Sequence, residues 1–395
     1  ALAYTRFFWY YKIEKWITLR TIGCTLWLRR KSLLQFFWLK FWNWKRRLAK
    51  MAEITEKVEL IKFDQEKYLA EGEMIYALRG EVEALADEVA KAGYSNIILL
   101  GIGGTEFEFA QFEYLVKKKS TVDIYGFDAA NVNTLRPKEI KKDSLVITAS
   151  ASGNTVEIIE ATKWLVEEGI RVVAFTKKDG PLGKIAQHVI EANVTTGQCE
   201  YSYMLQAFFI YRLLNQRGEF DNYEKFANQL KGAFKNLVDI RKSFEPRADK
   251  IAKAIHNAQY TVFTGSGSLW GETLLFAMCI LEEMQWVRTR PVTSSQFFHG
   301  TLELVEPGVP VFIVKGEDEF RKQDTRVENF CKMINAEYYV LDTQEFAFEG
   351  LDAEFRELIV PWIVTSLLTE RLAAHYEVYT KHNLEYRRYY RQFDY

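Results

Sequence analysis

The chain has 395 residues, of which 48% are hydrophobic and 27% are charged, as in an ordinary globular protein with room for two or three domains. Its formal net charge is only -1. The four cysteines (Cys24, Cys199, Cys279 and Cys331) lie far apart without a CxxC pair, which argues against a disulfide framework or a zinc site and favours a reducing, cytoplasmic setting.

Residues 1–50 differ from the rest of the chain. They hold twelve Lys or Arg against the single acid Glu14, about +11, and six of the ten Trp. No uncharged apolar stretch reaches the roughly 18 residues of a membrane span, and no cleavable signal pattern is present. This segment could lie on anionic lipid or nucleic acid, but Met51-Ala52-Glu53 resembles a natural start. We therefore expect a non-native extension, and neither a membrane nor a nucleic-acid partner.

Strand, glycine turn and helix follow one another from residue 96 onward. Helical spacing covers residues 54–92 and stops at Gly93, and the apolar run at residues 96–100 then enters the turn Gly101-Ile102-Gly103-Gly104-Thr105 and a helix to about Val116. Further strands are predicted at residues 122–126, 145–148, 172–175 and 189–190, with helices at 155–168 and 182–187. This alternation is typical of a parallel sheet covered by helices on both faces.

The same order returns after a helical stretch at residues 201–256. A strand at residues 260–264 enters Gly265-Ser266-Gly267-Ser268 and a helix through Met284, strands follow at 311–314 and 338–341, and a long helix covers 353–379. We therefore predict an α/β fold of two tandem three-layer halves with parallel sheets, plus N-terminal and C-terminal helices. The expected parts are an extension at 1–50, N-terminal helices at 51–93, a first half at 94–200, a helical connection at 201–257, a second half at 258–350, and a C-terminal helix and tail at 351–395.

The glycine turns first raise the possibility of dinucleotide binding. Glu106 and Trp270 stand where the third glycine of that fingerprint belongs, so the fingerprint fails in both turns. Asp128, after the next strand, could still imitate the ribose-binding acid. A nicotinamide-dependent enzyme therefore remains as an alternative.

A turn rich in hydroxyl groups follows the strand at residues 145–148. Ser150, Ser152, Gly153, Asn154 and Thr155 stand where this strand ends and a helix begins. Small residues let backbone N–H groups close on an anion, hydroxyls add donors, and the helix N-terminus attracts negative charge. The pattern predicts a phosphate-binding turn, although Ser152 or Thr155 could instead act only as a helix cap.

A second cluster pairs acids with a histidine. Glu282 and Glu283 end an apolar helix, where a carboxylate is partly desolvated and suited to proton abstraction, and His299 could complement it as an acid. Taken alone, either acid could be a solvated helix end and the histidine a packed core residue.

These residues together resemble the sugar-isomerase (SIS) domain family, whose members bind phosphorylated sugars through a Ser-x-Ser-Gly-x-Thr turn like residues 150–155. Within it the sequence is most similar to bacterial fructosamine deglycases acting on fructoselysine 6-phosphate. The likeness is carried by CILEEMQW at 279–286, FHGTLE at 298–303 and the tail HNLEYRRYY at 382–390, and it covers about residues 75–395. The chain departs from the family at Thr301, usually proline, at Phe298, and in a first glycine turn without cysteine.

The resemblance implies a mechanism without metal or cofactor. Glu283, sixteen residues before His299, would be the general base, and Ser150, Ser152, Gly153, Asn154 and Thr155, with Thr105, would hold the sugar phosphate. It also implies a homodimer in which Glu283 and His299 meet across chains, and a tail that contributes His382, Arg387 and Arg388. The acidic segment 317–321, with Asp324 and Arg326, also resembles the family and is interpreted as a salt-bridged loop.

The implied reaction converts a fructosamine 6-phosphate and water to glucose 6-phosphate and free amine through an enaminol and an imine. Alternatives within the family are a ketose–aldose phosphate isomerase and an aminosugar-phosphate deaminase. A non-catalytic sugar-phosphate sensor is a further alternative, but residues 52–92 resemble packing helices more than a DNA-reading domain.

Overall fold

The computed structural model describes residues 58–393, so the predictions for residues 1–50 lie outside the described part of the chain. The described chain begins with two helices, α3 (Gln65–Ala77) and α4 (Arg79–Ala92). Residues 58–64 are not helical, which corrects the helical spacing predicted from residue 54. Asp64 caps α3 by accepting a hydrogen bond from the Lys67 N–H, and Gly93, with φ 79°, ends α4 as predicted.

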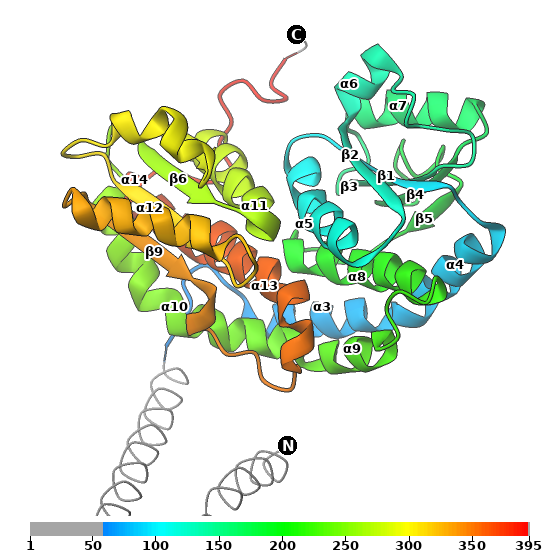
Figure 1. Ribbon diagram of the computed structural model, residues 1–395, viewed down its shortest axis with the longest axis horizontal. Helices are drawn as coiled ribbons and strands as arrows, with labels where there is room; N and C mark the ends of the chain where they lie inside the picture. Colours follow the sequence, from blue (N-terminus) through cyan, green and yellow to red (C-terminus); the bar gives the residue numbers. More distant parts are fainter. Residues whose placement is uncertain (1–57, 394–395) are drawn as a thin grey trace, which may run out of the picture. The chain divides into compact units, whose positions relative to one another are not determined.

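The first sheet is parallel, with strand order β2-β1-β3-β4-β5 (Figure 1). Its elements are β1 (Asn96–Gly101), α5 (Gly104–Lys119), β2 (Asp123–Asp128), α6 (Ala129–Leu135), β3 (Leu145–Ser150), α7 (Val156–Glu167), β4 (Arg171–Thr176) and β5 (His188–Ile190). Every residue of β1 and β3 is buried, which explains their continuous apolar runs.

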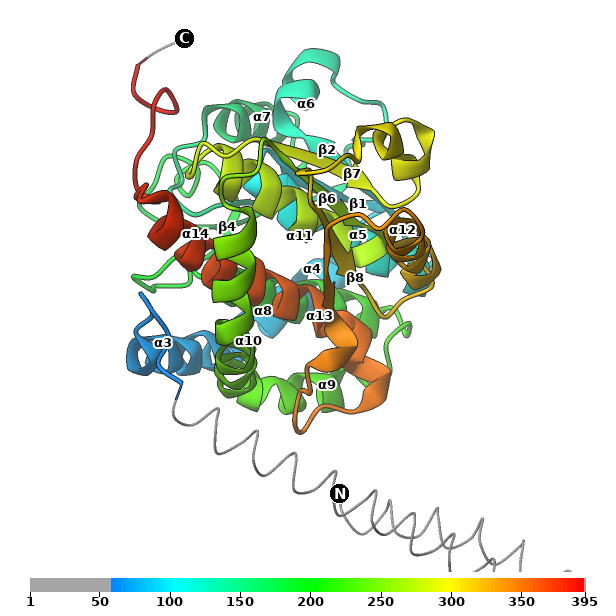
Figure 2. The same ribbon diagram turned by 90° about the vertical axis from the view of Figure 1, so that its left-hand side faces the viewer.

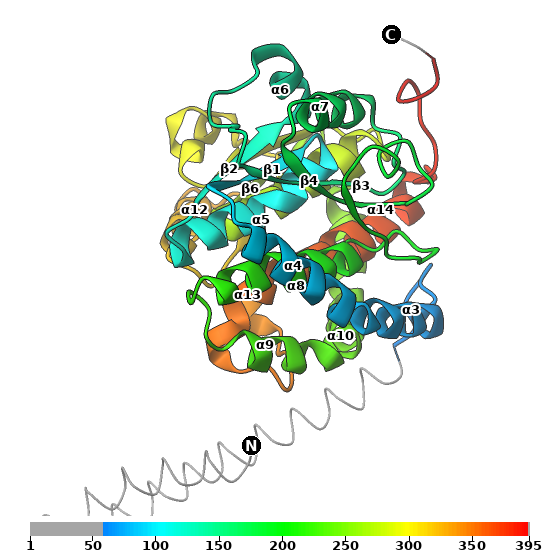
Figure 3. The ribbon, with the colours of Figure 1, turned by 90° about the vertical axis from the view of Figure 1, so that its right-hand side faces the viewer.

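Alternate residues of these strands pack into different cores. Ile97 and Leu99 face the core that contains α5 and α8 (Cys199–Gln216), whereas Ile98 and Leu100 face α6 and α7. Figure 3 shows α6 and α7 together on the side of the sheet away from α4 and α8. The first half therefore has the predicted three layers.

The second sheet repeats this topology with strand order β7-β6-β8-β9. Its elements are β6 (Thr261–Gly265), the turn η2 (Gly267–Leu269), α11 (Trp270–Leu274), the π-helix η3 (Leu275–Glu282), β7 (Thr289–Thr293), the short turns η4 (Gln296–His299) and η5 (Thr301–Leu304), β8 (Val311–Lys315), α12 (Arg321–Met333) and β9 (Tyr338–Asp342). In both halves the first strand lies between the second and the third, as a duplication predicts.

A shared helical layer joins the halves. It contains α8, α9 (Tyr223–Gln229), α10 (Ala233–Ile255), α13 (Arg356–Thr365), the π-helix η8 (Ser366–Leu372) and α14 (Ala373–Thr380). The first helices of the two halves, α5 and α11, pack closely against each other. Gly271 of α11 permits this approach, since a Cβ at its position would stand only 2.2 Å from the Phe107 carbonyl oxygen of α5. The predicted α/β fold with two parallel-sheet halves is present, and none of the described helices is long and apolar enough to cross a membrane.

The structure differs from the sequence-based expectations at three further places. Residues 182–187 form turns instead of a helix, since Gly180, Pro181 and Gly183 interrupt the pattern. The edge strand β7 was missed because its residues Thr-Arg-Pro-Val-Thr form no apolar run. Asp324 and Arg326, predicted in a loop, lie in helix α12.

Candidate functional site

The first glycine turn lies where the strand order of the first sheet reverses. β1 is paired with β2 on one side and with β3 on the other, and ligands of open α/β sheets bind beyond the carboxyl ends of strands at such a point. Thr105 closes the turn, because its Oγ1 accepts from the Ile102 N–H at 3.2 Å and donates to the Ile102 carbonyl at 3.0 Å. Gly103 has φ 55° and no atom within 4 Å of the place of a Cβ, so this turn is open.

The turn at residues 150–155 lies at the same edge, beyond β3. The Ser150 and Thr155 hydroxyls are 3.0 Å apart, and the Gly153 N–H donates to Ser150 Oγ at 3.1 Å. The Asn154 N–H donates to Ser152 Oγ at 3.2 Å. Gly153 has φ 70°, which a residue with a side chain rarely adopts. The predicted phosphate-binding residues therefore form one continuous turn.

The structure argues against the capping alternative for Thr155, whereas Ser152 does accept a hydrogen bond from the Asn154 N–H close to the helix start. Thr155 is the N-cap residue of α7, yet its side chain makes no capping hydrogen bond among the described residues. Its hydroxyl contacts Ser150 instead. The first N–H groups of α7 and the nearby hydroxyls are groups suited to binding an anion, and the phosphate-binding role of this turn stays a prediction.

The corresponding place in the second half is closed and acidic. A Cβ on Gly267, the counterpart of Gly103, would stand 2.4 Å from Asp318 Oδ2, and Ser268 N–H donates to the same oxygen at 3.4 Å. Beyond β8 the chain continues with Glu317, Asp318 and Glu319, where the first half has hydroxyl and glycine residues. A phosphate would be repelled there, so within residues 58–393 the acidic turn of the second half is a poorer candidate for an anion site than the predicted turn of the first half.

Glu283 follows directly after the π-helix η3, and its side chain is 28% exposed. Single π-helical turns are frequent at functional sites. Cys279, one turn earlier, has its sulfur 3.8 Å from the place of a Cβ on Gly104, so η3 approaches the first glycine turn. Burial, and then the charge of Glu283, raise the pKa of the Cys279 thiol to about 12, so this cysteine is a neutral neighbour.

The C-terminal tail contacts the segment after η3. Arg387 Nε donates to Glu283 Oε1 at 2.9 Å, and Gln285 Nε2 donates to the His382 carbonyl at 2.7 Å. The Trp286 ring contacts both the His382 ring, with centroids 4.1 Å apart, and the Arg388 guanidinium, 4.1 Å from the ring centre. The three tail residues singled out from the sequence thus all meet residues 283–286.

Two features of this contact were not predicted. Trp286 has φ 55°, which is unusual for a large side chain and often marks a functional site. The roles of Gln285 and Trp286 in holding the tail could not be deduced, because about one hundred residues separate them from their partners.

His299 lies apart from this cluster. It ends the turn η4, its side chain is exposed, and within residues 58–393 no hydrogen bond or ion pair joins it to Glu283. Gly300, with φ 137°, turns the chain immediately after it. The expectation that the two residues meet across chains stays a prediction.

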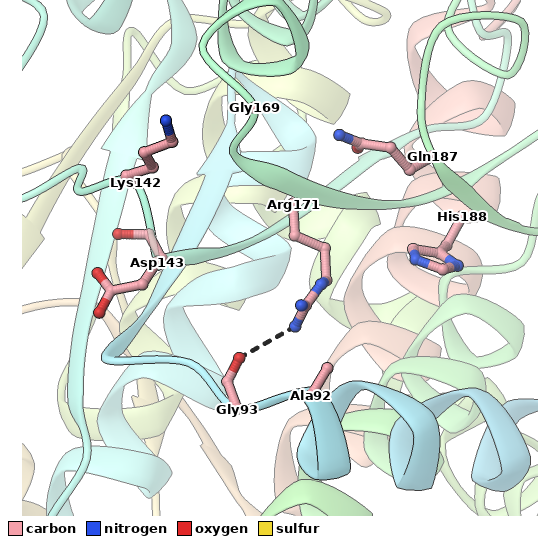
Figure 4. A pocket seen from close by; sticks show the side chains of 9 residues that line it. Ala92, Gly93, Lys142, Asp143, Gly169, Arg171, Gln187 and His188 are labelled. Atoms are coloured by element: carbon pink, nitrogen blue, oxygen red, sulfur yellow. Dashed lines mark hydrogen bonds between the residues drawn. The ribbon is translucent and has the colours of Figure 1, made fainter.

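Other features of the described chain carry no comparable chemistry. Asp128 Oδ1 accepts from the Asn131 N–H and caps α6, which accounts for this acid without a ribose. The described residues hold no cluster of ligands for a metal ion. A pocket of about 380 Å³ lies at the opposite edge of the sheet (Figure 4), where Arg171 donates to the Gly93 carbonyl after α4. Cations are expected beside helix C-termini, so this pocket needs no ligand to explain it.

Comparisons with known proteins agree with this picture, although no protein-family model matches the chain. The chain is 25% identical to a fructosamine deglycase of Bacillus subtilis over 78% of its own length and 95% of that protein. It is also 25% identical to the fructoselysine 6-phosphate deglycase of Escherichia coli, over 78% and 89% of the two chains.

Solved structures share the fold. A Salmonella typhimurium protein described as a phosphosugar isomerase matches 80% of this chain and 97% of its own with a TM-score of 0.74 at 20% identity. The C-terminal domain of a glucosamine-fructose-6-phosphate aminotransferase from Francisella tularensis matches 81% of this chain and 95% of its own, with a TM-score of 0.64 at 16% identity. The resemblance to sugar-isomerase proteins, and to the fructosamine deglycases among them, is confirmed, as is the fold with two tandem halves.

Proposed function

We propose that the chain is a sugar-phosphate-processing enzyme of the sugar-isomerase type, and that it deglycates a fructosamine 6-phosphate. The observation that carries the proposal is the hydroxyl- and glycine-rich turn at residues 150–155, which lies where the strand order reverses. The chain also carries Glu283 directly after η3, whose Cys279 approaches the first glycine turn. The similarity to two deglycases over 78% of the chain supports the reaction.

The substrate phosphate would be held by the first half. Ser150, Ser152 and Thr155 would supply hydroxyl donors, Gly153 and Asn154 would supply backbone N–H groups, and Thr105 would assist from the neighbouring turn. Fixing the distant phosphate positions the reacting carbons at the other end of the sugar.

The proton transfers would be carried out by Glu283 and His299. Glu283 takes a proton from C1 of the 1-amino-1-deoxyfructose, which gives the enaminol, while His299 handles the proton at the sugar oxygen. Return of a proton to C2 gives an imine, and water splits it to glucose 6-phosphate and free amine. The hydrogen bond from Arg387 Nε to Glu283 Oε1 would hold this carboxylate in place for the proton transfer.

We also infer that the enzyme works as a homodimer in the cytoplasm. His299 is exposed and contacts no described residue of the Glu283 cluster, so a second chain would have to complete the site. The described tail likewise exposes large aromatic side chains, including Tyr386 and Tyr389.

The test is incubation of the purified chain with fructoselysine 6-phosphate while glucose 6-phosphate and free lysine are measured together. Equal release of both products supports deglycation. An isomerase or aminosugar deaminase would instead turn over a ketose phosphate or glucosamine 6-phosphate in parallel assays. Binding of all these ligands without turnover would contradict the enzyme assignment and favour the sensor.

A further inference from the structure

Helix α12 packs against the segment that carries His299. In Figure 2 the yellow turns that follow β7 lie beside α12, and the contacts between side chains agree. Phe330 of α12 meets Phe297 and Phe298, with ring centroids 5.6 and 6.1 Å apart. Phe297 is fully buried, so the turn η4 is anchored in the core under α12.

Asp324 holds the beginning of this segment. This residue is 1% exposed, and its carboxylate accepts a 2.6 Å hydrogen bond from Ser294 Oγ and a 3.4 Å bond from the Gly316 N–H. Ser294 also donates its N–H to the Gly265 carbonyl at 3.1 Å. One buried carboxylate therefore ties the end of β7 to the end of β8, five residues before His299.

Arg326 holds the end of the segment. Its guanidinium lies 3.8 Å from the centre of the Phe298 ring, and Phe298 directly precedes His299. Within residues 58–393 Arg326 forms no ion pair, so the interaction that holds its guanidinium is the cation–π contact with the Phe298 ring. Phe298 is also a position at which the sequence departs from the family it resembles.

We propose that α12 is the platform that positions His299, with Asp324 acting through Ser294 and Arg326 acting through Phe298. Both are positioning residues, since neither contacts the reacting atoms. This inference rests on the proposed role of His299 in proton transfer. From the sequence alone, the residues Asp324 and Arg326 of α12 could be described only as charged.

A double-mutant cycle tests the proposal. In the wild-type chain, Arg326→Gln is expected to lower kcat about three- to tenfold with KM nearly unchanged, because a cation–π contact of ordinary strength is lost and His299 is left less well placed. In a His299→Gln chain the same change should have no further effect. Arg326→Lys, which keeps a cation over the ring, should restore part of kcat, and Lys322→Gln, on an exposed position of α12, should change nothing.

An equal loss of kcat in the His299→Gln chain, or no loss in the wild-type chain, would overturn the proposal. A second measurement needs no substrate. The imidazole proton signal of His299, assigned by its absence in His299→Gln, should shift or broaden in Ser294→Ala and Arg326→Gln. Unchanged signals would contradict the proposal, whereas changed signals in a chain that turns over no fructosamine phosphate would contradict only the proposed function.

Discussion

The neighbouring acids Glu282 and Glu283 differ in their surroundings. Glu283 contacts Arg387 of the tail, whereas Glu282 is exposed and accepts a hydrogen bond from Thr289 of β7. Glu283→Gln is expected to lower kcat by about 10²- to 10⁴-fold, the usual contribution of a general base, while substrate binding is largely kept. Steady-state kinetics with the fructosamine phosphate measure this, and Glu282→Gln is the matched control. Full turnover by Glu283→Gln would remove Glu283 from the base role.

One serine from a turn of each half can be used to test phosphate binding. Ser152→Ala removes a hydroxyl from the turn at residues 150–155 and should raise KM about three- to tenfold, since one hydrogen bond to a charged group is lost. Ser268→Ala, in the half that Asp318 closes, should leave KM unchanged. Isothermal titration with inorganic phosphate gives the same comparison without turnover. Equal effects of the two changes would argue against an anion site in the first half alone.

The candidate residues of the first half were predictable because they are neighbours in the sequence. The turn at residues 150–155 is one local motif, and its geometry follows from a strand, small residues and a helix start. The setting of Glu283 was not predictable from residues alone, since Arg387 reaches it from 104 positions away. Only the resemblance to a family drew attention to the tail.

At the scale of elements, the tail that follows α14 packs against residues 283–286, directly after η3. A chain that ends at Lys381 loses the contacts of His382, Arg387 and Arg388 and is expected to lose most of kcat. A chain that ends at Tyr390 keeps all three and should stay active, although it lacks part of the tail. The kcat of both shortened chains is measured, and thermal unfolding followed by circular dichroism checks that the two chains are equally stable. Full activity of the shorter chain would show that the tail takes no part in the reaction.

Secondary structure was predictable where burial is uniform and failed where special geometry intervenes. β1 and β3 are buried throughout and consist mainly of apolar residues, whereas β7 is an edge strand with polar residues and a proline. The π-helix η3 carries the same apolar pattern as an α-helix, so its widened turn before Glu283 leaves no signal in the sequence.

At the scale of the whole described chain, the duplication brings two equivalent acids together in the core. Glu108 lies seven residues after Gly101, and Glu272 lies seven residues after Gly265. Both are buried on the crossing helices α5 and α11 and are held from α8, Glu108 by Gln206 at 2.9 Å and Glu272 by Tyr203 at 2.8 Å. The sequence shows the repeat, but not that the two helices cross and bury these acids.

Burial of these two acids makes the stability of the protein depend on pH. Desolvation raises the pKa of Glu108 to about 7 and that of Glu272 to about 8, against roughly 4.3 for a glutamate in the unfolded chain. Between these values the folded protein keeps protons that the unfolded chain has released. The contribution of each acid to the free energy of unfolding therefore falls as pH rises from about 4.3 to its folded pKa, and is constant above it.

Glu272→Gln, which mimics the neutral acid, should consequently flatten the decline of stability between pH 5 and pH 8, and Glu108→Gln should do so between pH 5 and pH 7. Urea unfolding across this range measures the effect, and Glu160→Gln, at an exposed position of α7, is the control. The pH dependence of stability should differ between the variants and the wild-type chain because a glutamine side chain does not ionise. The native acid, in contrast, must either keep its proton at high pH or ionise while buried between α5, α8 and α11. If the slopes of the glutamine variants equalled that of the wild-type chain, the two acids would not be the buried proton-holding groups of the interface between the halves.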